Sequence, residues 1–578
     1  MNRKSICAWL LIASPALVPV PRAALAQAPK SADITGLWQA KRRLGPDVRG
    51  TLTIDRSAGG WRASIVGQAA PVRMSGDSVR LELPSGDAFN GLVSARRHAI
   101  VGHWIQERRT ASPLTLASCG ADCYRGEVVP LDEEFTFFLK VSKQPDGRLS
   151  AFLRNPERNL GHRWIPVRRI AVEGSNVRLL DARDSLVMPG VLRGDVLSVY
   201  IENRGGSYDF RRVPDTAYTD FYPRGRPTAQ YSYVPPRARN DGWPVGTLDE
   251  VGISSDSIVA MIQRLIAAPI DSAAAMQTHG LLIARHGKLV LEEYFFGEHA
   301  DKPHDTRSAS KSTLTVLIGA ARLQAGVKIG PETRVYSVLR PGAANLPPGK
   351  QAMTLEHLLT MSAGFDCDDS GDRPGDEDVI TDGDTHPDWY KAILDVDVVR
   401  ANGEKAVYCS LKPHLAGGVL GRVAGRPLQD MLRELVTEPL DMQRYYLGLS
   451  PLGDAYFGGG HRYLLRDFTK YAQLYLDGGT WRGRRILDQD WITRSVEPRY
   501  PMGRDARYGY LWWSREYPYR GRMINAYYMV GNGSQFVMYV PELDLVIGHY
   551  AGNYNDGSNT MLAELVPRVI LPSVQPGK

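Results

Sequence analysis

The chain has 578 residues, of which 43% are hydrophobic and 23% are charged, and its formal net charge is +7. These fractions are typical of globular proteins, so the composition excludes a fibrous repeat and a largely disordered chain. At one domain per roughly 150 residues, the length leaves room for two to four domains. The positive charge is not gathered in a basic run with interleaved aromatic residues, so we expect no nucleic-acid partner.

The first residues have the pattern of an export signal. Arg3 and Lys4 precede an apolar run over residues 6–20, and Ala24-Leu-Ala26 is a small-x-small cleavage pattern. We therefore predict that residues 1–26 are a signal peptide and that the protein is exported, periplasmic or secreted. An N-terminal membrane anchor is the alternative, but three prolines interrupt the run and it is short for a span. No other stretch approaches transmembrane length, so we expect no stable span after cleavage.

Cleavage would leave four cysteines, and this even number suits an oxidising compartment. Cys119 and Cys123 could close a small surface loop, which would leave Cys367 and Cys409 for a second bridge. A C-x₃-C pair without a matching His or Cys pair is a poor zinc site, and the twelve histidines are scattered singly. Acidic residues between 366 and 384 could be calcium ligands, but a solvated loop explains them better. We predict no metal and no cofactor.

Residues 27–213 alternate short apolar and polar runs with turn residues, which is typical of β-strands. The region also contains a weak internal echo, because residues 76–81 resemble residues 174–179. Gly91 and Gly190 follow the two copies at similar spacing. We therefore expect an all-β N-terminal region, either a barrel or a sandwich, that is possibly duplicated.

The sequence pattern changes after residue 213. Residues 214–241 contain five prolines without sustained periodicity, which indicates a linker. In residues 242–578 a predicted strand pair at 280–294 opens the domain and a second pair, 534–550, lies near its end, with helical patterns between them. A sheet assembled from both ends of a domain predicts an α/β architecture, with a central antiparallel sheet flanked by helices.

The strongest chemical signal is the serine-x-x-lysine motif at Ser308 and Lys311. Apolar residues after it predict a buried helix that begins at or just before Ser308, so one turn places both side chains on the same face. A serine hydroxyl is a weak nucleophile that needs an adjacent base, and a lysine amine serves as one only when burial and neighbours favour its neutral form. The positive end of the helix would disfavour an ammonium there. Spacing and chemistry thus both indicate a nucleophile and its base.

Two further segments could complete such a site. Tyr408 and Ser410 precede a predicted helix and offer a phenol and a hydroxyl for proton transfer. The triplet Gly531-Asn532-Gly533, followed by Ser534, leads into an apolar strand, where a glycine-rich edge lets a substrate approach backbone donors closely. Taken singly, the tyrosine could be a core or cap residue, and the glycine triplet could be a hairpin turn.

In this order along the chain, the three motifs resemble the serine β-lactamase and penicillin-binding-protein superfamily. Within it, the sequence is most similar to the class C-related branch, which includes 6-aminohexanoate-dimer hydrolases, esterases and D-aminopeptidase-type hydrolases. The resemblance covers about residues 242–570. It extends to the stretches 294–298, 306–312, 357–365, 508–513 and 541–546.

The resemblance implies acyl transfer. Ser308 would attack a carbonyl, Lys311 and Tyr408 would move the proton, and water would hydrolyse the acyl-enzyme. Oxyanion donors would be the backbone amides of Ser308 and Ser534, while Ser410 would support the proton network by a hydrogen bond. The resemblance also implies that a bridge between the remaining two cysteines would fix the loop of the catalytic tyrosine.

One departure from the superfamily bears on the substrate. Many penicillin-recognising relatives carry Lys-Thr-Gly where this chain has Gly531-Asn532-Gly533, so a cation for a substrate carboxylate is missing. The expected substrate is a small ester, an amide or a short peptide rather than a β-lactam. The alternative is a binding protein that kept the fold without catalysis, such as a cell-wall or peptide sensor. The sequence does not predict the role of the N-terminal region or the oligomeric state.

Overall fold

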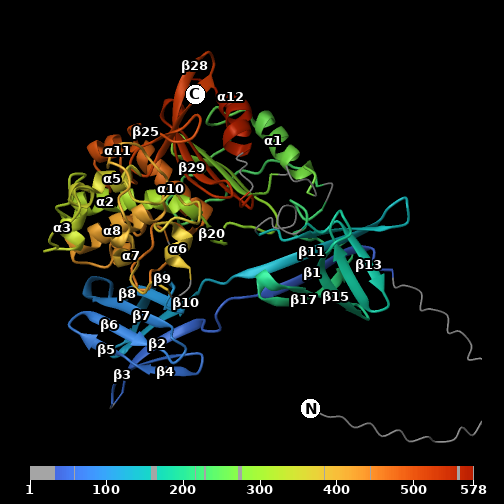
Figure 1. The fold of residues 1–578 in the computed structure, drawn as a ribbon, viewed down its shortest axis with the longest axis horizontal. Helices are drawn as coiled ribbons and strands as arrows, with labels where there is room; N and C mark the ends of the chain where they lie inside the picture. The colour runs from blue at the N-terminus through green and yellow to red at the C-terminus, as the bar shows by residue number, and fades with distance from the viewer. Residues whose placement is uncertain are drawn as a thin grey trace, which may run out of the picture.

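The computed structural model describes residues 33–57, 59–157, 166–214, 216–226, 229–270, 276–382, 385–442, 444–555 and 560–576. The predicted signal peptide lies outside the described residues. Within these ranges, no helix is both long enough and apolar enough to cross a membrane. Figure 1 shows three parts: a β-barrel, a second β-sheet, and a larger C-terminal region of helices and strands whose first helix is α1 (Ser255–Ala267).

The barrel is closed because β1 pairs with β11 on one side and with β17 on the other. Alternate residues of its strands, such as Phe137, Leu139 and Val199, point into an apolar core. Its strands are β1 (Gly36–Arg43), β11 (Glu134–Lys143), β12 (Leu149–Arg154), β13 (Arg169–Glu173), β14 (Asn176–Leu180), β15 (Leu186–Arg193), β16 (Val196–Ile201) and β17 (Gly206–Val213).

The second sheet is inserted into the barrel sequence, since all its N-terminal strands lie between β1 and β11. It packs its own core around buried residues such as Leu52, Phe89 and Trp104. We call it the inserted sheet. Its strands are β2 (Gly50–Ser57), β3 (Gly60–Ile65), β4 (Gln68–Pro71), β5 (Arg73–Ser75), β6 (Ser78–Glu82), β7 (Ala88–Ser94), β8 (Ala99–Gln106), β9 (Thr110–Gly120) and β10 (Cys123–Val128).

The echo seen in the sequence falls on equivalent hairpins of these two sheets. In the inserted sheet Val79 of β6 is paired with Gly91 of β7, and in the barrel Val177 of β14 is paired with Gly190 of β15. Each valine is buried and each follows a tight turn from the preceding strand. The two segments therefore share strand order and register, while a common origin remains a prediction.

The C-terminal region contains an antiparallel sheet buried on both faces. In β18, Leu281 and Ile283 pack into one apolar cluster and Leu282 and Ala284 into another, which explains why this strand reads as a continuous apolar run. The sheet order is β19-β18-β30-β29-β28-β27-β26-β25. The bounds are β18 (Thr278–Arg285), β19 (Lys288–Tyr294), β25 (Tyr500–Pro501), β26 (Arg507–Tyr508), β27 (Trp513–Tyr519), β28 (Arg522–Gly531), β29 (Gln535–Val540) and β30 (Leu545–Ala551).

Helices cover both faces of this sheet. Helix α1 and the C-terminal helical segment pack on one face, and α2, α8 and α10 belong to the larger cluster on the other. The longer helices are α1 (Ser255–Ala267), α2 (Lys311–Ala325), α8 (Leu411–Ala424), α10 (Leu465–Leu476), α11 (Gln489–Val496) and the π-helical segment Met561–Ile570. The predicted fold class, an all-β region followed by an α/β region with an antiparallel central sheet, is confirmed.

The predicted linker, residues 214–241, has no helix or strand among its described residues. It is nevertheless held against the C-terminal sheet. The Tyr231 hydroxyl donates to Glu293 at 2.6 Å and the Tyr233 hydroxyl donates to the carbonyl of Val290 at 2.7 Å, both on β19. The segment thus crosses between the β-rich part and the C-terminal region along the edge of the sheet, and the exact domain boundaries remain predictions.

Candidate active site

Ser308 lies in a 3₁₀ turn, residues 307–310, that leads directly into α2. Lys311 is the first residue of α2 and is 1% exposed, whereas Ser308 is half-buried. The Lys311 Nζ donates a hydrogen bond to the Ser308 Oγ at 2.7 Å and a second one to the carbonyl of Gly458. The helical spacing therefore brings the predicted nucleophile and base into direct contact.

Tyr408 comes to this pair from a segment one hundred residues further along the chain. The Lys311 Nζ lies 4.9 Å from the centroid of the Tyr408 ring, and the ring packs near Trp513. Among the described residues, the Tyr408 hydroxyl has no hydrogen-bond partner. Catalytic hydrogen bonds are often completed only when a substrate is bound. The structure thus brings the hydroxyl of Ser308, the amine of Lys311 and the ring of Tyr408 together.

The residues after Tyr408 are anchored at two points. Cys409 forms a disulfide with Cys367, and Asp369 accepts hydrogen bonds from the Ser410 amide at 2.9 Å and the Ser410 hydroxyl at 2.7 Å. The predicted pairing of the cysteines is confirmed, since Cys119 is also bonded to Cys123. Ligand atoms of Cys367, Asp369 and Cys409 lie within 4.8 Å of one another. Because both sulfurs belong to the disulfide, this group does not supply thiolate ligands.

The acidic loop before this anchor is satisfied by its own backbone. Asp376 is buried and accepts amide hydrogen bonds from Asp368, Gly371 and Arg373 at 2.7 to 3.1 Å. Burial would raise the pKa of Asp376, but these backbone donors hold it below the usual range. The carboxylate has a structural role within the loop.

The glycine triplet reaches the nucleophile through Gly531, the last residue of β28. A Cβ built on Gly531 would lie 2.2 Å from the carbonyl oxygen of Thr306 and 3.0 Å from the amide nitrogen of Ser308. Only glycine allows this approach. The Asn532 side-chain oxygen accepts a hydrogen bond from the Asn555 amide at 2.8 Å. The carbonyl oxygen of Ser534 lies 2.7 Å from the Nδ1 of His549. The structure gives Ser534 a buried place beside β30, and its role as an oxyanion donor remains a prediction.

Sequence reasoning missed two contributors to the site. Arg307 adopts a left-handed conformation (φ 49°), and Asp305 accepts its amide hydrogen at 2.8 Å and lies 3.2 Å from its Nε. Gly458 supplies the carbonyl that accepts from Lys311. The run Gly458-Gly459-Gly460 was the available signal, because three consecutive glycines indicate close backbone packing.

Lys412 is a second buried lysine close to the tyrosine segment. Its Nζ donates to the carbonyls of Met361 at 3.0 Å and Val407 at 2.7 Å, and burial lowers its pKa to about 7. An unfolded chain keeps that proton up to about pH 10. Between these values the unfolded state binds more protons, so stability rises with pH, by about 1.4 kcal/mol per pH unit. Below about pH 7 both states are charged and the slope vanishes.

We therefore expect the free energy of unfolding of the wild type, minus that of Lys412→Met, to rise between about pH 7 and pH 10. Urea denaturation at constant ionic strength measures it, and taking the difference cancels the other titrating groups. Lys328→Met, which changes an exposed lysine beyond the end of α2, is the matched control and should show no such slope. A pH-independent difference for Lys412→Met would show that this amine is not desolvated in the native state.

Comparison with known proteins finds a family model, a relative in sequence and solved structures to which this chain is similar. The family model described as Beta-lactamase matches residues 262–560. The 6-aminohexanoate-dimer hydrolase of Paenarthrobacter ureafaciens is 24% identical over 226 residues, which are 37% of this chain and 56% of that protein. The matched stretch thus spans little more than half of that relative.

Two solved structures show the same kind of similarity. One is the octameric penicillin-binding protein homologue from Pyrococcus abyssi, with a TM-score of 0.40, 18% identity, and coverage of 50% of this chain and 72% of that one. The other is a penicillin-binding protein homolog from Caulobacter crescentus, with a TM-score of 0.39, 16% identity, and coverage of 52% and 93%. The family model alone matches just over half of this chain. The chain belongs to the beta-lactamase family.

Proposed function

We propose that this protein is a serine hydrolase that cleaves an ester or amide bond through an acyl-enzyme on Ser308, with Lys311 and Tyr408 as proton-transfer groups. The observation that carries the proposal is the 2.7 Å hydrogen bond from the Lys311 Nζ to the Ser308 Oγ. Membership of the beta-lactamase family supports it.

The first step is attack of the Ser308 Oγ on the substrate carbonyl carbon. As the new bond forms, the hydroxyl proton passes to the Lys311 amine, which must be neutral to accept it. Lys311 is buried at the start of α2, and its Nζ lies on the Ser308 Oγ, so the amine is placed to take this proton directly. The proton then moves to the leaving group, with the Tyr408 phenol as the relay. Water then attacks the carbonyl carbon of the acyl-enzyme, and the same groups move its proton back to the Ser308 Oγ. This step releases the carboxylic acid and restores the serine hydroxyl.

Negative charge that develops on the carbonyl oxygen needs backbone donors. The Ser308 amide lies at the start of a helical run, where N–H groups have no intrahelical partner. We assign the second donor to the amide of Ser534, and the glycines of the triplet let the strand end lie against the nucleophile turn. The hydrogen bond from the Ser410 hydroxyl to Asp369 would hold the segment that carries Tyr408 beside Lys311.

The substrate is proposed to be a small ester, an amide or a short peptide. Because Gly531-Asn532-Gly533 replaces a lysine-bearing triplet, this edge offers no cation to a substrate carboxylate. A relative named for hydrolysis of the 6-aminohexanoate dimer, an amide, supports this class. The two disulfides fit an oxidising compartment, and we propose that the protein is exported.

The test is covalent labelling followed by turnover. Wild-type protein is incubated with a fluorophosphonate and, separately, with p-nitrophenyl esters, aminoacyl p-nitroanilides and a chromogenic cephalosporin. We expect a fluorophosphonate adduct that maps to Ser308 and hydrolysis of esters or anilides in preference to the cephalosporin. Absence of both adduct and turnover would contradict the proposal and favour the alternative, a binding protein without catalysis.

A further inference from the structure

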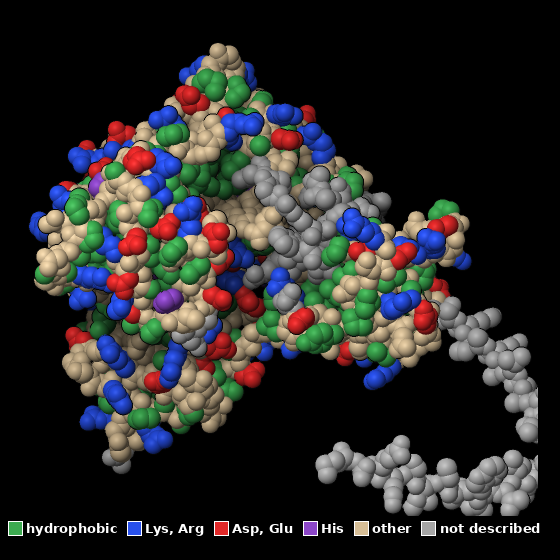
Figure 2. All heavy atoms as spheres, in the orientation of Figure 1, with side chains coloured by type: hydrophobic (Ala, Val, Ile, Leu, Met, Phe, Trp, Pro, Cys, Tyr) green, Lys and Arg blue, Asp and Glu red, His purple; other side chains and the backbone are tan. Residues whose placement is uncertain are grey.

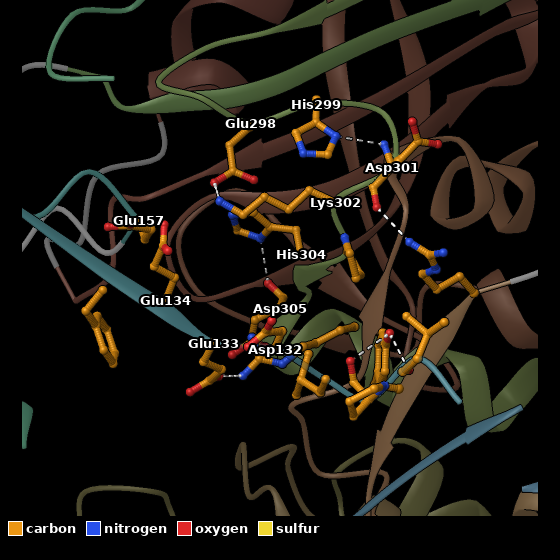
Figure 3. A pocket seen from close by; sticks show the side chains of 18 of the residues that line it. Asp132, Glu133, Glu134, Glu157, Glu298, His299, Asp301, Lys302, His304 and Asp305 are labelled. Carbon is orange, nitrogen blue, oxygen red and sulfur yellow. Dashed lines mark hydrogen bonds and ion pairs between the residues drawn. The ribbon is translucent and has the colours of Figure 1, made fainter. Parts of the chain in front are cut away.

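A cavity of about 250 Å³ lies where the β-rich part meets the C-terminal region. One wall comes from Glu133, Glu134 and Phe135 at the start of β11, with Glu157 beyond β12. The opposite wall comes from residues 298–305. Figure 3 shows Glu157 and Glu134 facing Glu298 and Lys302 across this space. In Figure 2, acidic side chains border the hollow between the C-terminal region and the barrel.

The cavity adjoins the nucleophile turn. Asp305 and Tyr554 line it, and both contact Arg307, the residue before Ser308. Asp305 accepts the Arg307 amide hydrogen at 2.8 Å, and the Arg307 guanidinium lies 4.9 Å from the centroid of the Tyr554 ring. Part of the cavity wall is therefore in contact with the turn that carries Ser308.

The barrel also reaches the end of the C-terminal sheet that carries the site. The carbonyl of Pro156 lies 3.0 Å from the Nε2 of His279 on β18, and a Cβ on Gly552, just after β30, would meet the same carbonyl at 3.2 Å. The segment that bears Glu157 is thus fixed on the sheet.

The two half-buried carboxylates Glu157 and Glu298 of this cavity differ in their charge partners. Lys302 forms an ion pair with Glu298 at 2.7 Å. Glu157 accepts hydrogen bonds from the Thr136 amide at 3.1 Å and the Asn155 side chain at 2.6 Å, and in the described part of the chain it has no ion pair. Burial raises the pKa of Glu157 to about 7, whereas Lys302 holds the pKa of Glu298 below its usual range despite burial. Lys302 thus pairs directly with Glu298, whereas Lys302 and Arg154 act on Glu157 only from beyond ion-pair distance.

We propose that this cavity is a substrate pocket of the Ser308 site and that Glu157, supplied by the barrel, recognises an ammonium group on the substrate. This inference rests on the proposed function and adds the substrate class to it. A substrate ammonium would supply the second positive charge and a charge-assisted hydrogen bond to Glu157. A neutral or anionic group would desolvate the Glu157 carboxylate without bringing a positive charge within ion-pair distance, which costs binding energy.

The test compares straight-chain acyl p-nitrophenyl esters that end in an ammonium with isosteres that end in a methyl group, over several chain lengths. We expect the wild type to favour the ammonium ester of the best length by about 10- to 100-fold in kcat/KM, as for a hydrogen bond to a charged group. Glu157→Gln should lose this preference and hydrolyse the methyl esters within about twofold of the wild type. Glu173→Gln, which changes an exposed carboxylate of the barrel that is paired with Arg178 and lies outside the cavity lining, is the matched control and should keep the preference.

Each outcome separates the two claims. A wild type that hydrolyses both series equally, or a preference that survives in Glu157→Gln, overturns the pocket assignment and leaves the hydrolase proposal standing. A wild type that hydrolyses neither series overturns the proposed function and the pocket together. Thermal unfolding of each variant shows whether a lost preference accompanies an intact fold.

Discussion

Lys311→Met is expected to lower kcat/KM for ester hydrolysis by about 10³- to 10⁴-fold, because it removes the group that accepts the Ser308 proton. Methionine fills similar volume, so the buried position at the start of α2 should stay packed. The measurement is steady-state kinetics with a p-nitrophenyl ester that the wild type accepts. Lys328→Met, which replaces an exposed lysine outside the site, should retain wild-type kinetics.

The double variant makes this prediction sharper. Groups that act as one unit have non-additive effects, so Ser308→Ala with Lys311→Met should be no slower than Ser308→Ala alone, within about threefold. Additive losses would mean that Lys311 acts independently of the nucleophile. A Lys311→Met enzyme within about tenfold of the wild type would mean that another group takes the proton.

Gly531→Ala is expected to lower kcat by about 100-fold while the protein remains folded. A Cβ at this position would lie 2.2 Å from the Thr306 carbonyl and 3.0 Å from the Ser308 amide, so the turn that carries the nucleophile must move. A displacement of roughly 1 Å at a reacting group can cost about this much in rate. Kinetics and thermal unfolding are measured together so that a loss of rate is not mistaken for a loss of fold.

The control for this variant is Gly448→Ala on β21 (Tyr445–Gly448), where an added Cβ meets nothing within 4 Å and the backbone is not left-handed. It carries the same chemical change without a close contact and should keep full activity. If Gly531→Ala behaves like Gly448→Ala, the strand end does not set the position of Ser308.

The local part of the site could be predicted from the sequence because it depends on helical spacing alone. Ser308 and Lys311 lie one turn apart on a helix with an apolar stripe, and any such helix brings them together. Tyr408 needed the resemblance to a family, since its contact with Lys311 spans about one hundred residues. The left-handed Arg307 and the carbonyl of Gly458 were not predicted, because both depend on how distant loops pack.

The N-terminal region illustrates the same limit. Alternating patterns predicted its strands, but not that β1 would pair with β11 and β17 around an inserted sheet. Nor did they indicate that β9 of this sheet pairs with β21, which continues through β22 (Arg462–Tyr463) to β20 (His304–Asp305). This last strand ends three residues before Ser308. The pattern along one strand specifies which face is buried and carries no information about its partner.

The central claim is that Ser308, Lys311 and Tyr408 surround one acyl carbon. A crystal structure of the protein trapped with a slowly hydrolysed ester tests it most directly. We predict an acyl group on the Ser308 Oγ, with the Lys311 Nζ and the Tyr408 hydroxyl both within hydrogen-bond reach of that oxygen, which is about 3 Å. An acyl group on another residue, or a Tyr408 hydroxyl well outside that reach, would contradict the claim.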